Sequence, residues 1–143
     1  MASSVRPPYR QWRLLALVAL GGAVGTGLRE TLTLAMPDGS LFPLTTFGIN
    51  VAGASALGAL LEILAPSGAE TASRRSLRLL LGTGLLGGFT TYSALTVASA
   101  QLLIDAQPLW SLGYALGTVV LGVAAAVGGI LLARIALRRG ARS

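Results

Sequence analysis

The chain has 143 residues, of which 53% are hydrophobic and 11% are charged, and its mean hydropathy is +0.73. An ordinary globular chain has about 25% charged residues, so this composition predicts an integral membrane protein in a lipid bilayer. The sequence has no Cys and no His, which excludes disulfides and imidazole-based metal sites, and its net charge of +6 comes from arginines that flank apolar segments, which argues against a nucleic-acid binder.

Four apolar stretches are each long enough to cross a bilayer, which takes about 20 residues. We expect membrane-spanning helices over residues 14–35, 41–64, 77–104 and 109–133. The third stretch is longer than one crossing needs, and its middle, residues 84–91, is rich in Gly and Thr, which favours a broken helix. The predicted fold class is therefore an all-α integral membrane protein with four transmembrane helices, the third of them broken. Residues 14–134 form the transmembrane domain, between basic tails at residues 1–13 and 135–143.

The arginines are distributed unevenly between the two ends of these spans. One end, with both termini and the middle loop, has ten: Arg6, Arg10, Arg13, Arg74, Arg75, Arg78, Arg134, Arg138, Arg139 and Arg142. The other end has only Arg29. Basic flanking residues are preferentially kept in the cytoplasm, so we predict a multi-pass protein of the cell membrane, inserted in one orientation with both termini cytoplasmic.

Polar residues at membrane depth are costly and are candidates for function. Asn50, in the second span, offers amide N–H donors to a desolvated anion, with Thr46 one turn away on the same face. The alternative is that Asn50 only bonds a neighbouring helix. In the third span, Gly87 and Gly88 next to Thr90 and Thr91 suggest unpaired carbonyls that bind a small cation, although Gly-x-x-x-Gly helix packing is the alternative.

The fourth span places Tyr114, Thr118 and Gly122 on one helical face, which suggests a polar track. The alternative is an interfacial Tyr beside Trp110 and a Thr bonded to its own helix. Arg29 is either a snorkelling residue at a helix end or an electropositive residue at an anion vestibule.

Three motifs resemble the Fluc (CrcB) fluoride channel family: GAVGTGLR at residues 22–29, TFGINVAG at 46–53 and GLLGGFTTYS at 84–93. The resemblance covers about residues 14–134. It implies an antiparallel dimer with one subunit inverted, two fluoride pores, and a structural Na⁺ at the dimer centre held by backbone carbonyls, here those of Gly87 and Thr90. It also implies that Asn50 and Thr46 line the pore together with Tyr114 and Thr118.

The chain departs from this family pattern at two positions. The family has phenylalanine directly after the Thr pair and again three residues later, where this chain has Tyr92 and Leu95. A leucine has no aromatic edge to offer an anion, so we expect the pore lined by these residues to be impaired. Together with the arginine bias, this gives the hypothesis that the chain is a fixed-orientation subunit paired with an inverted paralogue.

The sequence thus predicts a passive, fluoride-selective channel subunit that lets fluoride leave the cytoplasm and so reduces its toxicity. A non-conducting assembly subunit is one alternative. A small proton-coupled multidrug transporter is another, but it needs a carboxylate in the first span, where residues 14–28 have none. An enzyme is disfavoured, because five carboxylates without His or Cys provide no acid–base or nucleophilic constellation.

Overall fold

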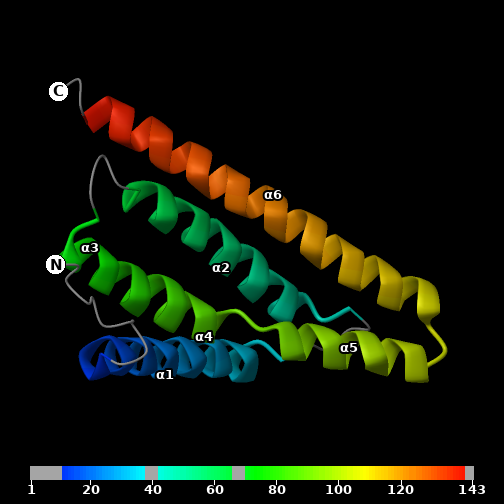
Figure 1. Cartoon of the computed structure of the whole chain (residues 1–143). Coiled ribbons are helices and arrows are strands. Elements are labelled where there is room, and N and C mark those ends of the chain that lie inside the picture. Colours follow the sequence, from blue (N-terminus) through cyan, green and yellow to red (C-terminus); the bar gives the residue numbers. More distant parts are fainter. Residues whose placement is uncertain (1–10, 38–41, 66–69, 141–143) are drawn as a thin grey trace, which may run out of the picture.

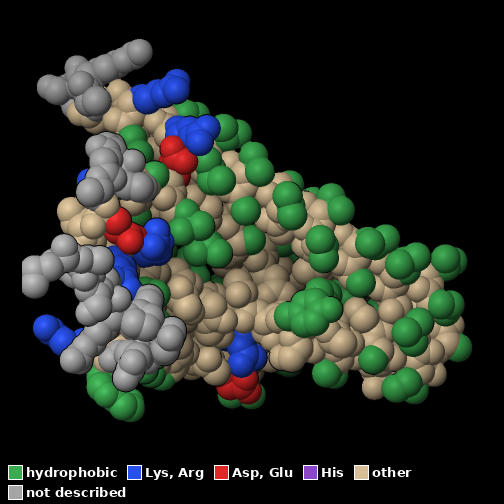
Figure 2. Space-filling view, in the orientation of Figure 1, with side chains coloured by type: hydrophobic (Ala, Val, Ile, Leu, Met, Phe, Trp, Pro, Cys, Tyr) green, Lys and Arg blue, Asp and Glu red, His purple; other side chains and the backbone are tan. Residues whose placement is uncertain are grey.

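The computed structural model describes residues 11–37, 42–65 and 70–140, and within these ranges all regular secondary structure is helical (Figure 1). Three long helices run through the molecule: α1 (Trp12–Ala35), α2 (Leu44–Ile63) and α6 (Pro108–Gly140). Each is long and apolar enough to cross a membrane. Most of their side chains face outward, where large aliphatic residues cover the surface (Figure 2). A helix that is apolar on its exposed side is typical of a lipid-facing span, so the chain is a multi-pass membrane protein.

The remaining crossing is built in pieces. It begins with α3 (Ala72–Leu77), continues through a π-helical segment, η2 (Arg78–Leu86), and the short turn α4 (Gly87–Phe89), and resumes as α5 (Tyr92–Ile104). The prediction of four crossings with a broken third helix is therefore confirmed. The break lies at Thr90 and Thr91, at the C-terminal edge of the Gly- and Thr-rich stretch.

The observed helix ends differ slightly from the predicted ones. α1 begins at Trp12, and α6 continues to Gly140, so the C-terminal basic segment is largely helical instead of a separate tail. Residues 1–10, 141–143 and position 41 of the second predicted span lie outside the described residues.

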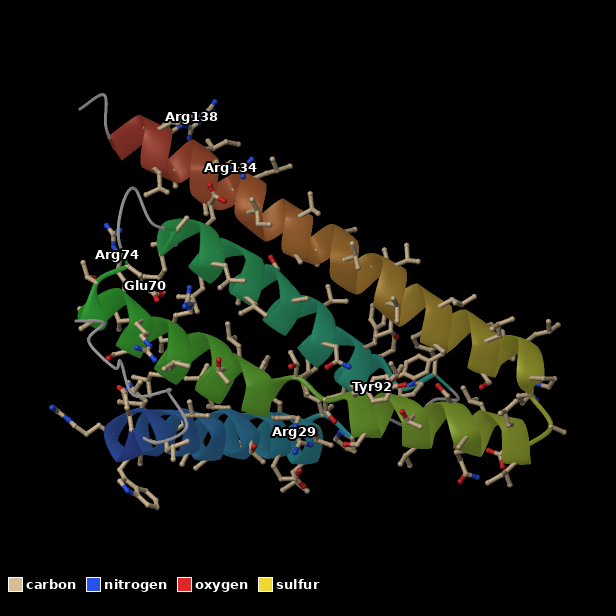
Figure 3. The ribbon with its side chains drawn as sticks, viewed as in Figure 1. Arg29, Glu70, Arg74, Tyr92, Arg134 and Arg138 are labelled. Carbon is tan, nitrogen blue, oxygen red and sulfur yellow. The ribbon has the colours of Figure 1, made fainter. Side chains whose placement is uncertain are left out.

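The start of α1 and the end of α6 lie at the same end of the molecule, as does α3 (Figure 1). Basic side chains gather at this end, where Arg78 is 2.6 Å from Glu70 and Arg134 is 2.8 Å from Glu62 (Figure 3). Arg29 lies apart from them, towards the C-terminal end of α1 (Figure 3). The first and last helices therefore start and finish at one end of the molecule, and the described arginines other than Arg29 gather at that same end.

The first and third crossings pack closely through glycines. A Cβ added at Gly84 would approach the carbonyl oxygen of Val18, and one at Gly88 the carbonyl oxygen of Gly22. Such small-residue contacts are the usual way for membrane helices to come close together. Gly84 and Gly88 therefore serve helix packing, which was the alternative interpretation of the glycines in this stretch. The break follows directly after this packed segment.

The second and fourth crossings meet at a similar seam. A Cβ at Gly58 on α2 would collide with the carbonyl oxygen of Ala126, and one at Gly129 on α6 would collide with that of Ser55. Only glycine allows the two backbones to approach this closely. The seam fixes α6 against α2 and determines how much space remains between them beside the break.

Candidate functional site

The break itself is formed by two extended threonines whose hydroxyls serve the backbone. Thr90 has φ −78° and ψ 156°, and Thr91 has φ −145° and ψ 121°. The Thr90 hydroxyl donates to the carbonyl oxygen of Leu86 at 2.9 Å, and the Thr91 hydroxyl oxygen accepts from the amide of Ala94 at 3.1 Å, which caps α5. The Thr91 hydroxyl therefore satisfies an amide freed by the break, whereas the Leu86 carbonyl also keeps its helical donor, the Thr90 amide, at 3.0 Å.

Asn50, on α2, forms two hydrogen bonds with the backbone of Thr91 in the break. Its Nδ2 donates to the carbonyl oxygen of Thr91 at 3.0 Å, and its Oδ1 accepts from the Thr91 amide at 2.8 Å. α2 comes close enough because residue 53 is glycine: a Cβ there would collide with the Thr90 methyl group. In this structure the alternative interpretation, a hydrogen bond to a neighbouring helix, is therefore realised. One of the two Nδ2 hydrogens remains for another acceptor.

A groove of about 420 Å³ runs along the molecule beside the break, between α2, α5 and α6. It is lined by Asn50, Gly53, Ala54, Leu57, Thr90, Thr91, Tyr92, Leu95, Thr118, Val119, Gly122, Val123 and Ala126. Four residues that were predicted to line an anion pathway therefore line the same groove: Asn50, Tyr92, Leu95 and Thr118. Thr90, whose carbonyl was predicted to hold a cation, borders the same groove.

Tyr114 and Thr46 lie elsewhere. Tyr114 is fully buried, and its ring meets that of Phe42 edge-on, with centroids 5.0 Å apart at 90°. The alternative that placed Tyr114 in an interfacial aromatic belt is therefore wrong. Thr46 is half-buried in the first turn of α2 and does not line the groove.

Thr118 is buried, and its hydroxyl donates to the carbonyl oxygen of Tyr114 at 2.7 Å, one turn back on the same helix. The alternative of a threonine bonded to its own helix is thus observed in this structure. Thr118 borders the groove, but because its hydroxyl proton is directed to the backbone, the hydroxyl would serve an anion only after rotating about its C–O bond.

The two positions that depart from the family pattern have opposite environments. Tyr92, the first residue of α5, is 80% exposed (Figure 3). Leu95 is 7% exposed and packs in a cluster with Leu102 and Tyr114, against which Phe42 and Phe47 also lie. Sequence reasoning missed Phe42 and Phe47 because no local pattern distinguishes an aromatic residue packed in this cluster from one facing lipid.

Arg29 and Gly87 lie outside the groove lining. The Arg29 side chain is 24% exposed, with Nη1 3.7 Å from Oε2 of Glu30. This neighbouring carboxylate reduces the field that Arg29 would present to an anion. Gly87 belongs to α4, directly before the break.

A family model described as "CrcB-like protein, Camphor Resistance (CrcB)" matches residues 16–130. The chain belongs to the CrcB family. The match contains all three sequence motifs, so the resemblance inferred from them is confirmed.

Several CrcB relatives extend over nearly the full chain. "Fluoride-specific ion channel FluC 2" of Leifsonia xyli subsp. xyli is 44% identical over 94% of this chain and 93% of its own length. "Fluoride-specific ion channel FluC 1" of Cutibacterium acnes is 44% identical over 91% of this chain and 90% of its own length. A "Fluoride-specific ion channel FluC" of Chelativorans sp. is 42% identical over 84% of this chain and 95% of its own length.

Proposed function

We propose that this chain is a subunit of a fluoride-selective channel that lets fluoride leave the cytoplasm down its electrochemical gradient. The observation that carries the proposal is the 44% identity, over 94% of the chain, to a protein named as a fluoride-specific ion channel. The groove beside the broken helix supports the proposal, because its largely apolar lining includes the polar side chains of Asn50 and Thr118. The chain acts as a channel and not as an enzyme.

Fluoride is small and strongly hydrated, so a pore has to replace its water with convergent hydrogen-bond donors. The second Nδ2 hydrogen of Asn50 is such a donor, at a residue that lines the groove. The hydroxyl of Thr118, which also borders the groove, becomes a second donor after rotation. Thr46, Tyr114 and the partly neutralised Arg29 would then act at the approaches to this segment and not in it.

The groove opens on the outer surface of the subunit, so a second subunit has to complete the pore. Irregular backbone at membrane depth is tolerated only where protein or a water-filled cavity covers it. Thr90 and Thr91 are such backbone, and the phenol of Tyr92 beside them is 80% exposed. An inverted subunit placed over this face would cover the break and enclose the groove on its open side.

A structural Na⁺ is part of the proposal, held by the carbonyl oxygens of Gly87 and Thr90. The donor set fits, because broken membrane helices bind Na⁺ through carbonyls that the break releases. In a continuous helix the Ala94 amide would donate to Thr90, but here it donates to the Thr91 hydroxyl oxygen. When bound, Na⁺ would supply positive charge at these carbonyl oxygens, where the proposed dimer would bring two helix breaks together.

The fixed orientation of the chain determines what kind of partner it needs. Ten of the eleven arginines belong to the end that has both termini, which we place in the cytoplasm. A chain with this bias supplies few inverted copies of itself, so we infer that an oppositely inserted paralogue completes the dimer. Because Tyr92 is hydroxylated and Leu95 is drawn into the core cluster, the pore that these residues line would conduct less than its counterpart.

Fluoride efflux from liposomes tests this proposal. We expect vesicles with this chain and an inverted CrcB paralogue to release fluoride, and vesicles with this chain alone to release it much more slowly. Full efflux from the lone chain would overturn the pairing. Normal efflux from a pair in which Asn50 of this chain is changed to Leu would identify it as the non-conducting assembly subunit.

A further inference from the structure

The side chain of Asn50 has a role in the break that differs from donating to an anion. We propose that Asn50 is a positioning residue that holds the backbone of the break at Thr91 and occupies the amide that would donate to the Gly87 carbonyl in a continuous helix. This inference rests on the proposed function only in its last step, where the released carbonyl is available to the Na⁺. The first step concerns the hydrogen bonds of this chain alone.

The argument starts from the hydrogen-bond register of a helix. In an uninterrupted α-helix, the amide of residue 91 donates to the carbonyl of residue 87. Here the Thr91 amide donates instead to Oδ1 of Asn50 at 2.8 Å. Gly87 therefore loses the donor that continuous helix would have supplied.

Three other carbonyls at the break, those of Leu86, Gly88 and Thr91, each accept a hydrogen bond. The Leu86 oxygen accepts from the amide and the hydroxyl of Thr90, at 3.0 and 2.9 Å. The Gly88 oxygen accepts from the Thr26 hydroxyl at 3.4 Å, and the Thr91 oxygen accepts from Nδ2 of Asn50 at 3.0 Å. Gly87 differs from these three in that Asn50 has taken its helical donor, which leaves its carbonyl oxygen available to a cation.

The carboxamide is well suited to this task, because it has the donor and the acceptor of a peptide group. It meets both polar groups of Thr91 at once, as a neighbouring strand would. A hydroxyl at position 50 is too short to meet both groups, and a carboxylate accepts from the Thr91 amide but cannot donate to the Thr91 oxygen. Only an amide therefore supplies both bonds.

Amide hydrogen exchange of the purified channel in lipid nanodiscs tests the positioning role directly. We expect Asn50→Leu to speed exchange of the Thr91 amide by about tenfold, the change for losing about one net hydrogen bond. Gln101→Leu is the matched control, since it also replaces an amide by Leu, and the Gln101 amide bonds only its own helix, at Asp105. Unchanged Thr91 exchange in Asn50→Leu would overturn the inference.

A second variant covers the case in which Asn50→Leu does not fold. Asn50→Asp keeps the acceptor for the Thr91 amide, so we expect that amide to exchange within about threefold of the parent, about half the tenfold effect on a free-energy scale. Rapid exchange of Thr91 in Asn50→Asp would contradict the inference, because the acceptor is still present there.

The dependence of thermal stability on Na⁺ tests the last step separately. We expect Na⁺ to raise the unfolding temperature of the parent and of Gln101→Leu relative to N-methylglucamine, and to do so much less in Asn50→Leu. A parent without a Na⁺ effect would reject the proposed cation site, while Thr91 exchange still decides the positioning role. A full Na⁺ effect in an Asn50→Leu protein with rapid Thr91 exchange would show that cation binding does not depend on the bonds from Asn50 to the break.

Discussion

The seam between α2 and α6 allows a sharp prediction about stability, because two adjacent glycines of α6 have opposite surroundings. A Cβ at Gly129 would collide with the carbonyl oxygen of Ser55, whereas a Cβ at Gly128 would meet no described heavy atom within 4 Å. We therefore expect Gly129→Ala to separate the helices and Gly128→Ala to leave them in place. The two variants add the same methyl group one residue apart.

The expected magnitude follows from two opposing contributions. Alanine gains about 1 kcal/mol of helix propensity over glycine in both variants, so this gain cancels in the comparison. Forcing an extra carbon into a packed seam costs about 1–3 kcal/mol, and only Gly129→Ala incurs that cost. Gly129→Ala is therefore expected to be less stable than Gly128→Ala by about 1–3 kcal/mol.

Reversible unfolding in mixed detergent micelles, followed by circular dichroism, measures this difference. Fluoride efflux provides a second measurement, because Leu57 and Ala126, which line the groove, lie next to the seam. We expect efflux to change in Gly129→Ala and to stay near the parent value in Gly128→Ala. Equal stability of the two variants would refute the interpretation of Gly129 as a close-contact residue.

Three further predictions concern single side chains. Tyr92→Phe removes a hydroxyl from a side chain that is 80% exposed, so stability in detergent should change by less than about 0.5 kcal/mol while fluoride efflux rises; a fall in efflux would mean that the hydroxyl assists conduction. Glu62→Gln removes the negative charge beside a half-exposed Arg134, so the midpoint of chemical unfolding should shift little, and a large shift would contradict a surface-type ion pair. Thr118→Val removes a hydroxyl that bonds only its own helix, so unfolding should change by less than about 1 kcal/mol while efflux falls, and unchanged efflux would remove Thr118 from the pathway.

Much of the fold was predictable from the sequence, because the length of an apolar stretch and the bilayer thickness determine how many times a chain crosses. The composition of residues 84–91 also predicted the break, since Gly weakens a helix and Thr hydroxyls serve the backbone. The structure has both features in consecutive segments: Gly84 and Gly88 pack on α1, and the break follows at Thr90. The sequence alone offered them as alternatives, because it does not show which glycines meet another helix.

The site was only partly predictable, because its contacts join segments far apart in the chain. Asn50 was singled out from its polar side chain at membrane depth, but its two bonds to Thr91 depend on how α2 lies against the break. Tyr114 was placed on a polar track by its spacing, yet it is buried against Phe42, because a helical face says nothing of what covers it. Leu95 was expected in a pore and also belongs to the core cluster.

The measurement that bears most directly on the account is fluoride release from liposomes loaded with potassium fluoride and potassium chloride, started with valinomycin and followed with ion-selective electrodes. With this chain and an inverted CrcB partner in the membrane, fluoride should leave rapidly while chloride stays inside. Retention of fluoride by those vesicles, or release of both anions at similar rates, would contradict a fluoride-selective channel.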